Sequence, residues 1–155
     1  MRNLYEVLRE LSISFQEVEH EPVYTIEQAQ MIAAHLDGIG TKALFLTDKR
    51  GRYFLVILEE NKRANIKELA KAVGAARLSF ADSEALQRVL GLEQGSVSPL
   101  GVIHDAENQV VLLLDRDLQN SALLVHPNVN NKTIAIRFED LIRLIQAEGH
   151  AYMLI

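Results

Sequence analysis

Three short segments carry the residues in this sequence whose types could do chemistry. Lys42 begins an apolar, strand-like run, where an ammonium can donate to a carbonyl or phosphate oxygen. Residues 95–99 form a Gly-x-x-x-Pro turn whose glycine lets backbone N–H groups approach a ligand, and Pro99 fixes the bend. His126 follows another apolar run and places an imidazole near two asparagines. Taken singly, each segment is equally compatible with an ordinary strand end or surface loop.

Signatures of several other enzyme classes are absent from the sequence. The chain has no cysteine, which excludes disulfides, thiolate nucleophiles and Cys-based zinc sites. Its five histidines form no HExxH or other close pair at metal-ligand spacing, so we expect no metal site. No GxSxG elbow, Walker A loop or GxGxxG motif occurs, which leaves phosphoryl transfer and nicotinamide chemistry without support. We therefore expect no cofactor.

Charge is unevenly distributed along the chain. The net charge is -5, which argues against indiscriminate binding to nucleic acid. From Lys42 to Arg77, however, nine basic residues stand against four acidic ones, while the rest of the chain has seven basic and seventeen acidic residues. A locally basic face on an acidic protein suits a partner with concentrated phosphate, bound at one place. The alternative is a solvated helix face and hairpin that are basic by chance.

Apolar periodicity and turn residues predict the elements that position these segments. Helices are expected at 3–11, from a Thr25–Gln28 capping box to about 36, from Asn65 to Gly74, from 82 or 83 to Gly91, and at 139–148. Strands are expected at 14–19, 41–47, 52–58, 110–114, 122–125 and 133–137, with a hairpin turn at 48–51.

These elements predict one domain of the α/β (α+β) class over residues 1–155, because no repeat or linker divides the chain. We expect a single mixed, largely antiparallel sheet or barrel-like core with short surrounding helices. The longest unbroken apolar run, 110–114, is too short to span a bilayer, and the charged N-terminus has no signal-peptide core. A cytoplasmic protein with no membrane partner is therefore expected.

Taken in order, the segments resemble the YbaK/ProX family of freestanding aminoacyl-tRNA deacylases, which is related to the editing domain inserted in bacterial prolyl-tRNA synthetases. The resemblance covers nearly the whole chain and runs through residues 22–25, 42–46, 62–63, 77–81, 95–99 and 126–130. Segments 77–81 and 126–130 are closer to the ProX branch, which clears alanine from proline tRNA, than to the YbaK branch, which clears cysteine. Ala43 stands where the ProX branch often has Asn, and this departure leaves the preferred amino acid open.

The resemblance implies a trans-editing hydrolase that deacylates mischarged proline tRNA, above all alanyl-tRNA(Pro), in a small amino-acid pocket. In it, Lys42 is the catalytic residue and orients the aminoacyl ester or the adjacent phosphate, while His126 positions the ester. The neighbouring ribose hydroxyl helps to activate water, which agrees with the lack of a recognisable triad. The other implied substrate contacts are Tyr24, Thr25, Gly95, Ser96, Val97, Ser98, Pro99, Gly101 and Asn130. The implied tRNA-phosphate contacts are Lys62, Arg63, Lys67 and Lys71.

A separate editing pocket has a physical reason, because a pocket built for proline rejects the smaller alanine by only ~1–3 kcal/mol. The acidic remainder of the chain predicts weak, salt-sensitive tRNA binding, aided by a prolyl-tRNA synthetase or an elongation factor. Three alternatives stay open: a cysteinyl-tRNA(Pro) deacylase, a non-catalytic adaptor of the same fold that binds tRNA or a synthetase, and a small-molecule or nucleotide-binding domain.

Overall fold

A long hairpin forms the middle of the molecule. In this computed structural model, which describes residues 2–22 and 25–155, the hairpin strands are β2 (Ile39–Thr47) and β3 (Tyr53–Glu59). The carboxylate of Asp48 accepts hydrogen bonds from two backbone N–H groups of the turn. Gly51 takes the left-handed φ of +78° that the turn requires. The predicted hairpin is therefore confirmed.

Six further strands in the described part of the chain extend this hairpin into one sheet: β1 (Gln16–Glu19), β4 (Ser79–Phe80), β5 (Val110–Leu114), β6 (Ala122–Val125), β7 (Lys132–Arg137) and β8 (Tyr152–Leu154). The order is β1-β7-β6-β2-β3-β5-β8, with β4 paired to β2. Four pairs are antiparallel, whereas β2–β6, β3–β5 and β5–β8 are parallel. The predicted mixed sheet is confirmed. More strand pairs are parallel than the hairpin signal in the sequence indicates. Long connections let strands that are distant in the sequence run in the same direction side by side.

Helices cover the sheet on both sides. The described α-helices are α1 (Leu4–Glu10), α2 (Ile26–Ala33), α3 (Ile66–Ala72), α4 (Ser83–Leu90) and α5 (Phe138–Ala147), and two 3-10 helices are η1 (Pro99–His104) and η2 (Arg116–Leu118). Polar caps start the first four α-helices: Thr25, Asn65 and Asp82 do so as predicted, Asn3 caps the first helix, and each accepts a backbone N–H of the first turn. None of these described helices is long and apolar enough to cross a membrane.

Two helix boundaries differ from the prediction. The second helix ends at Ala33 rather than near residue 36, before β2 begins at Ile39. The Gly-x-x-x-Pro turn at 95–99 leads into η1, which begins at Pro99 because proline fits the first helical position and the Ser98 side chain caps it. The end of this loop is thus a helical turn with defined hydrogen bonds.

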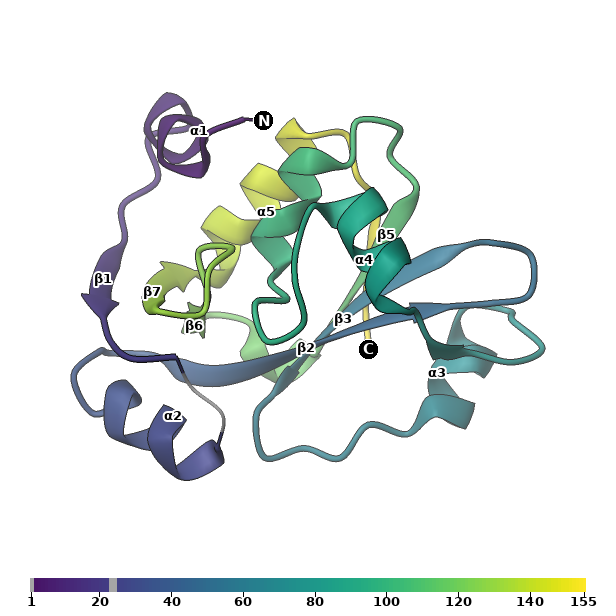
Figure 1. Cartoon of the computed structure of the whole chain (residues 1–155), viewed down its shortest axis with the longest axis horizontal. Helices are drawn as coiled ribbons and strands as arrows, with labels where there is room; N and C mark the ends of the chain where they lie inside the picture. Colours follow the sequence, from purple (N-terminus) through teal and green to yellow (C-terminus); the bar gives the residue numbers. More distant parts are fainter. Residues whose placement is uncertain (1, 23–24) are drawn as a thin grey trace.

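Alternating side chains of the hairpin pack into two apolar layers. Figure 1 shows α4 and α5 on one side of the β2–β3 hairpin and α2 and α3 on the other. Along β3, Leu55 and Ile57 are buried in the layer shared with α4 and α5, whereas Phe54 and Val56 pack with Leu69 of α3. The hairpin is therefore held from both faces, and its two ends are fixed relative to the rest of the sheet.

Candidate functional site

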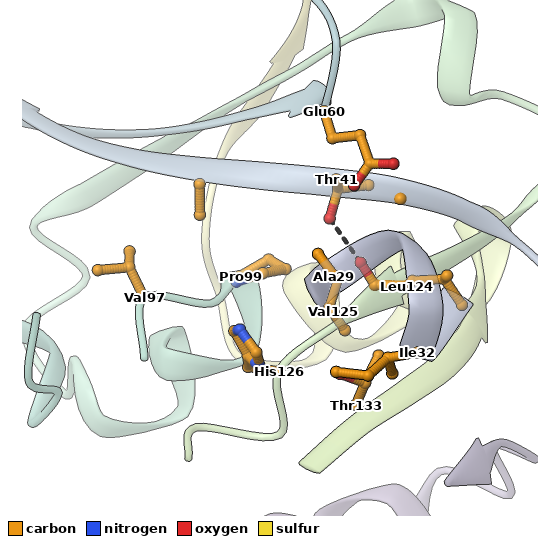
Figure 2. Close-up of a pocket in the computed structure, with 12 residues that line it drawn as sticks. Ala29, Ile32, Thr41, Glu60, Val97, Pro99, Leu124, Val125, His126 and Thr133 are labelled. Atoms are coloured by element: carbon orange, nitrogen blue, oxygen red, sulfur yellow. Dashed lines mark hydrogen bonds between the residues drawn. The ribbon is translucent and has the colours of Figure 1, made fainter. Parts of the chain in front are cut away.

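A small cavity opens where the start of β2 meets β6, β7, α2 and the loop before η1 (Figure 2). Its volume is about 80 Å³, roughly half of the ~150 Å³ that accommodates a benzene ring in a protein interior. The described lining is mostly apolar and consists of Ala29, Ile32, Gly40, Thr41, Ala43, Glu60, Val97, Pro99, Leu124, Val125, His126 and Thr133. The site therefore has room for a small side chain.

The cavity walls are set by local interactions. Thr25 caps α2 through a reciprocal capping box, and this helix brings Ala29 and Ile32 to the cavity. The hydroxyl of Thr41 donates to the carbonyl of Leu124 at 2.7 Å, which fastens β2 to β6 where the two strands share a short parallel register. Thr25, a predicted substrate contact, therefore holds α2 in place and does not itself line the cavity. Tyr24, the neighbouring predicted contact, lies outside the described residues.

The two predicted ligand loops lie against each other. The Asn128 side-chain N–H donates to the carbonyl of Leu100 at 3.3 Å, and Asn128 adopts a left-handed φ of +66°. Gly95 has a φ of +88°, and the amide nitrogen of Asn130 lies 3.9 Å from the point where a Cβ on this glycine would stand. The structure therefore brings segments 95–101 and 126–130 together, with Gly95 and Asn130 beside the cavity lining rather than in it.

Within the 95–101 loop, Val97 and Pro99 line the cavity, whereas three predicted substrate contacts support the loop from behind. Ser98 is buried, and its hydroxyl accepts the backbone N–H that follows Pro99. Ser96 is also buried and closes a turn through its backbone N–H. Gly101 packs so closely that an added Cβ would stand 2.6 Å from a leucine methyl group. These three residues hold the shape of the loop.

One imidazole nitrogen of His126, a residue that lines the cavity, has no hydrogen-bond partner among residues 2–22 and 25–155. His126 donates from Nδ1 to the carbonyl oxygen of Lys132 at 2.9 Å, which leaves Nε2 of the neutral ring as an acceptor. Burial lowers the pKa of His126 below the ordinary 6.5 and the nearby His20 lowers it further, against the opposing effect of the Lys132 carbonyl. The His20 ring, 6.4 Å away between centroids, bonds through Nε2 to the Thr133 hydroxyl at 2.8 Å. His126 is therefore neutral at pH 7.

Glu60, a carboxylate at the cavity, is not among the predicted site residues. Glu60 follows β3, and its backbone N–H donates to the carbonyl of Gly40 at 2.9 Å. Its side chain extends toward Thr41 at the cavity rim (Figure 2). Burial raises the pKa of Glu60, and the charge of Glu59 raises it further. No spacing in the sequence marks this residue, because the contact with Gly40 forms across the hairpin.

Lys42 lies next to the cavity but is not among the residues that line it. Its neighbours Thr41 and Ala43 both line the cavity. Because successive side chains of a strand point to opposite faces, Lys42 belongs to the face of β2 that carries Leu44 and Leu46. It is half-buried, and its ammonium makes no hydrogen bond or ion pair with another residue in the described ranges.

The four predicted phosphate contacts divide between two places. The ammonium of Lys62 lies 2.7 Å from Asp115 Oδ1 and 2.6 Å from Asp117 Oδ2, so it is already bound by two carboxylates. Lys62 and Arg63 both line a groove beside β8, the C-terminal strand. These two residues therefore face a partly acidic surface.

The other two predicted contacts belong to a strongly basic surface. Lys67 and Lys71 of α3 line a groove of about 640 Å³ together with Arg77. Arg77 also lines an adjoining groove of about 380 Å³ beside the hairpin turn. Asp48 in that groove is paired with Arg52 at 2.6 Å. We call the two together the basic groove, with the cationic residues Lys49, Arg50, Arg52, Lys67, Lys71 and Arg77.

The sequence is similar to those of known proteins along nearly its whole length. Residues 20–144 match the family model described as aminoacyl-tRNA editing domain. The prolyl-tRNA editing protein ProX of Acetoanaerobium sticklandii is 37% identical over 147 residues, covering 94% of this chain and 90% of that protein. The prolyl-tRNA synthetase associated domain-containing protein 1 of Danio rerio is 35% identical over 152 residues, covering 96% of this chain and 83% of that protein.

Solved structures show the same fold. A crystal structure described as a candidate trans-editing enzyme for prolyl-tRNA synthetase superposes with a TM-score of 0.76 at 19% identity, covering 97% of this chain and 92% of that one. The predicted fold class and the predicted kinship are confirmed. The chain belongs to the aminoacyl-tRNA editing domain family, and with it to the aminoacyl-tRNA deacylases.

Proposed function

We propose that this protein removes alanine from mischarged proline tRNA by hydrolysing the ester between the alanyl group and the terminal ribose. The observation that carries the proposal is the size and lining of the cavity: about 80 Å³, with mainly aliphatic side chains. A methyl side chain fits such a space, whereas the pyrrolidine ring of proline approaches the size of a benzene ring. Exclusion of the larger, correct amino acid is what a second sieve requires.

The lining supports alanine over amino acids with hydroxyl side chains. Ala43 adds a methyl group to the wall where the ProX branch often has an amide. The Thr41 hydroxyl is already used by a backbone carbonyl, and the Thr133 hydroxyl by His20. Neither threonine is therefore free to bind a serine hydroxyl, and the remaining acceptors are His126 Nε2 and the Glu60 carboxylate at the rim, so serine is disfavoured where its hydroxyl enters the apolar part of the cavity. Cysteine, with a thiol that behaves as a small apolar group, remains the competing substrate.

Hydrolysis needs a water oxygen to attack the ester carbonyl carbon, while the ester C–O bond breaks and the leaving ribose oxygen takes a proton. In our proposal the neutral Nε2 of His126 accepts a hydrogen bond from the ribose or the attacking water and so fixes its position. Lys42 belongs to the other face of β2, so in our proposal its long side chain reaches round the strand to the mouth of the cavity, where an ammonium suits the phosphate next to the terminal ribose. Rigid loops behind Val97 and Pro99 keep the ester in place.

The basic groove gives the tRNA a docking surface at the other end of the hairpin. From Ala43 to the turn at Asp48, a strand rise of ~3.3 Å per residue gives a separation of roughly 15–20 Å. We propose that phosphates of the acceptor stem bind there while the single-stranded 3′ end reaches the cavity. Such contacts are few, which fits transfer of the tRNA from a prolyl-tRNA synthetase or an elongation factor.

The test is release of labelled alanine from alanyl-tRNA(Pro), with prolyl-, cysteinyl- and seryl-tRNA(Pro) run alongside. We expect fast release of alanine, no release of proline, and loss of at least about tenfold in kcat/KM for Lys42→Ala. The Arg9→Ala variant, which removes an exposed cation on α1 outside both the cavity and the basic groove, is the control for the alanine assay. Release of cysteine alone would identify cysteinyl-tRNA(Pro) as the substrate. A folded protein that is inactive on all four aminoacyl-tRNAs would support the adaptor function.

A further inference from the structure

Glu60 is the charged group at the cavity that the mechanism above leaves unused. Among the described lining residues it alone carries a charge at neutral pH, because His126 is held neutral and the others are uncharged. Its carboxylate makes no hydrogen bond or ion pair with any residue in 2–22 or 25–155. A half-buried carboxylate without a cation has lost part of its hydration, so a cationic group on a ligand bound in the cavity would stabilise it.

The backbone is shaped to hold this carboxylate at the cavity. The Glu60 N–H donates to the Gly40 carbonyl at 2.9 Å, which extends the β2–β3 ladder by one residue past β3. The carboxylate lies directly against Gly40, so closely that a Cβ at that position would collide with it. Glycine at position 40, itself a lining residue, therefore leaves the space that the Glu60 side chain occupies.

The neighbouring acidic residue behaves differently. The Glu59 carboxylate accepts hydrogen bonds from the backbone and side-chain N–H groups of Asn61, at 3.1 and 2.9 Å. It lies outside the cavity lining. Glu59 is thus satisfied within the turn, whereas Glu60 is not, and the raised pKa of Glu60 agrees with a carboxylate that lacks a cation.

We infer that Glu60 is a specificity-determining residue that binds the α-ammonium of the aminoacyl group. This inference rests on the proposed function, since an aminoacyl ester is the ligand that places one ammonium next to a small side chain. With the side chain in the apolar cavity, the ammonium at the rim pairs with the carboxylate and the ester carbonyl is directed toward the loop with Val97 and Pro99. Ligands whose α-substituent is uncharged lose this contact.

The test compares two esters of proline tRNA that differ in one group. In L-lactyl-tRNA(Pro) a hydroxyl replaces the α-ammonium of the alanyl ester, at nearly the same size. We expect Glu60→Gln to lower kcat/KM for the alanyl ester about 10- to 100-fold, mainly through KM, and to leave the lactyl ester unchanged. The intrinsic reactivities of the esters cancel when the ratio of the two is compared between wild type and variant.

Two further variants sharpen this comparison. Gly40→Ala pushes the Glu60 carboxylate away and should lower the ratio of kcat/KM for the alanyl ester to that for the lactyl ester, as Glu60→Gln does. Glu59→Gln, which removes an adjacent but satisfied charge, should change neither ester. If Glu60→Gln lowers hydrolysis of both esters equally, Glu60 acts on the water or on folding and the inference is wrong. It is equally wrong if neither ester is affected.

A binding measurement separates this inference from the proposed function. The probes are the non-hydrolysable amides 3′-(L-alanylamino)-3′-deoxyadenosine and its lactyl counterpart, titrated by NMR or calorimetry. Glu60→Gln should weaken binding of the alanyl compound and not of the lactyl one. Equal affinity of the wild-type protein for both compounds would overturn the inference, even if alanine editing is found. If the protein hydrolyses none of the esters but still binds the alanyl compound selectively, the proposed reaction is wrong and the inference about Glu60 stands.

Discussion

His126 carries the clearest pH dependence in the site. Burial, with His20 nearby, lowers its pKa below 6.5, so the neutral ring persists down to mildly acidic pH. If its Nε2 must accept a hydrogen bond, kcat/KM for alanyl-tRNA(Pro) is level at pH 7 and falls as the pH drops through that lowered pKa. Because the folded protein binds this proton less readily than the unfolded chain, stability also declines as the pH falls below 6.5.

The measurement is a pH–rate profile for wild type and His126→Ala, with folding checked by circular dichroism at each pH. The variant should lose roughly 10- to 100-fold in kcat/KM at pH 7. Its profile should also lack the acidic fall that the imidazole causes. A variant that keeps the wild-type profile would show that another group titrates and that His126 serves only as a wall of the cavity.

At the level of elements, the sequence predicts what is local and misses what is distant. The capping residues Thr25, Asn65 and Asp82 mark helix starts because their hydrogen bonds are made within one turn. The two-residue β4 strand and the C-terminal β8 strand gave no signal, since such short strands are defined by their partners.

The site shows the same limit. Segments 95–101 and 126–130 were recognisable as loops with glycine, proline and asparagine, and the structure brings them together. Glu60 was not recognisable, because it reaches the cavity only when β3 pairs with β2 beside Gly40. For Lys42, the sequence placed the residue on the right strand, whereas its face depends on the register and packing of the whole sheet.

The basic groove makes a prediction about helix α3 and the segment that follows it. Lys67→Gln/Arg77→Gln removes two exposed charges from the groove. If both bind phosphate, tRNA affinity falls, and the slope of log K against log salt becomes shallower by about one for each contact, or about two in total. Filter binding over a range of salt concentrations measures both quantities.

The control for the groove is a second double variant with the same change of charge. Arg9→Gln/Arg137→Gln removes two exposed arginines on α1 and at the end of β7, far from the groove. It should leave the salt slope nearly unchanged. Equal effects of the two double variants would mean that the net charge, and not a defined groove, governs tRNA binding. Turnover at saturating tRNA should be close to wild type in both.

For the whole molecule, Asp115 is the buried group that ties several segments together. It follows β5, and its carboxylate accepts from the backbone N–H groups of Glu59 and Asp117 and from the ammonium of Lys62. Burial by itself would raise the pKa of Asp115, but these hydrogen bonds outweigh it and hold the pKa below 3.8. The end of the central hairpin, η2 and the turn after β3 therefore meet at one carboxylate.

Asp115→Ala should lower the free energy of unfolding by about 2–3 kcal/mol at pH 7, because two part-buried N–H groups and the Lys62 ammonium lose their acceptor. Since the folded pKa lies below that of the unfolded chain, the stabilisation is complete above pH 3.8 and fades as the pH falls through the folded value. Urea unfolding at pH 7 and again below pH 3.8 should therefore show a gap between wild type and variant that narrows in acid. Asp117→Asn, at an exposed carboxylate that pairs with the same lysine, should change stability by less than about 1 kcal/mol. A gap of the same size at both pH values would assign the effect of Asp115→Ala to lost packing instead of the ionised carboxylate.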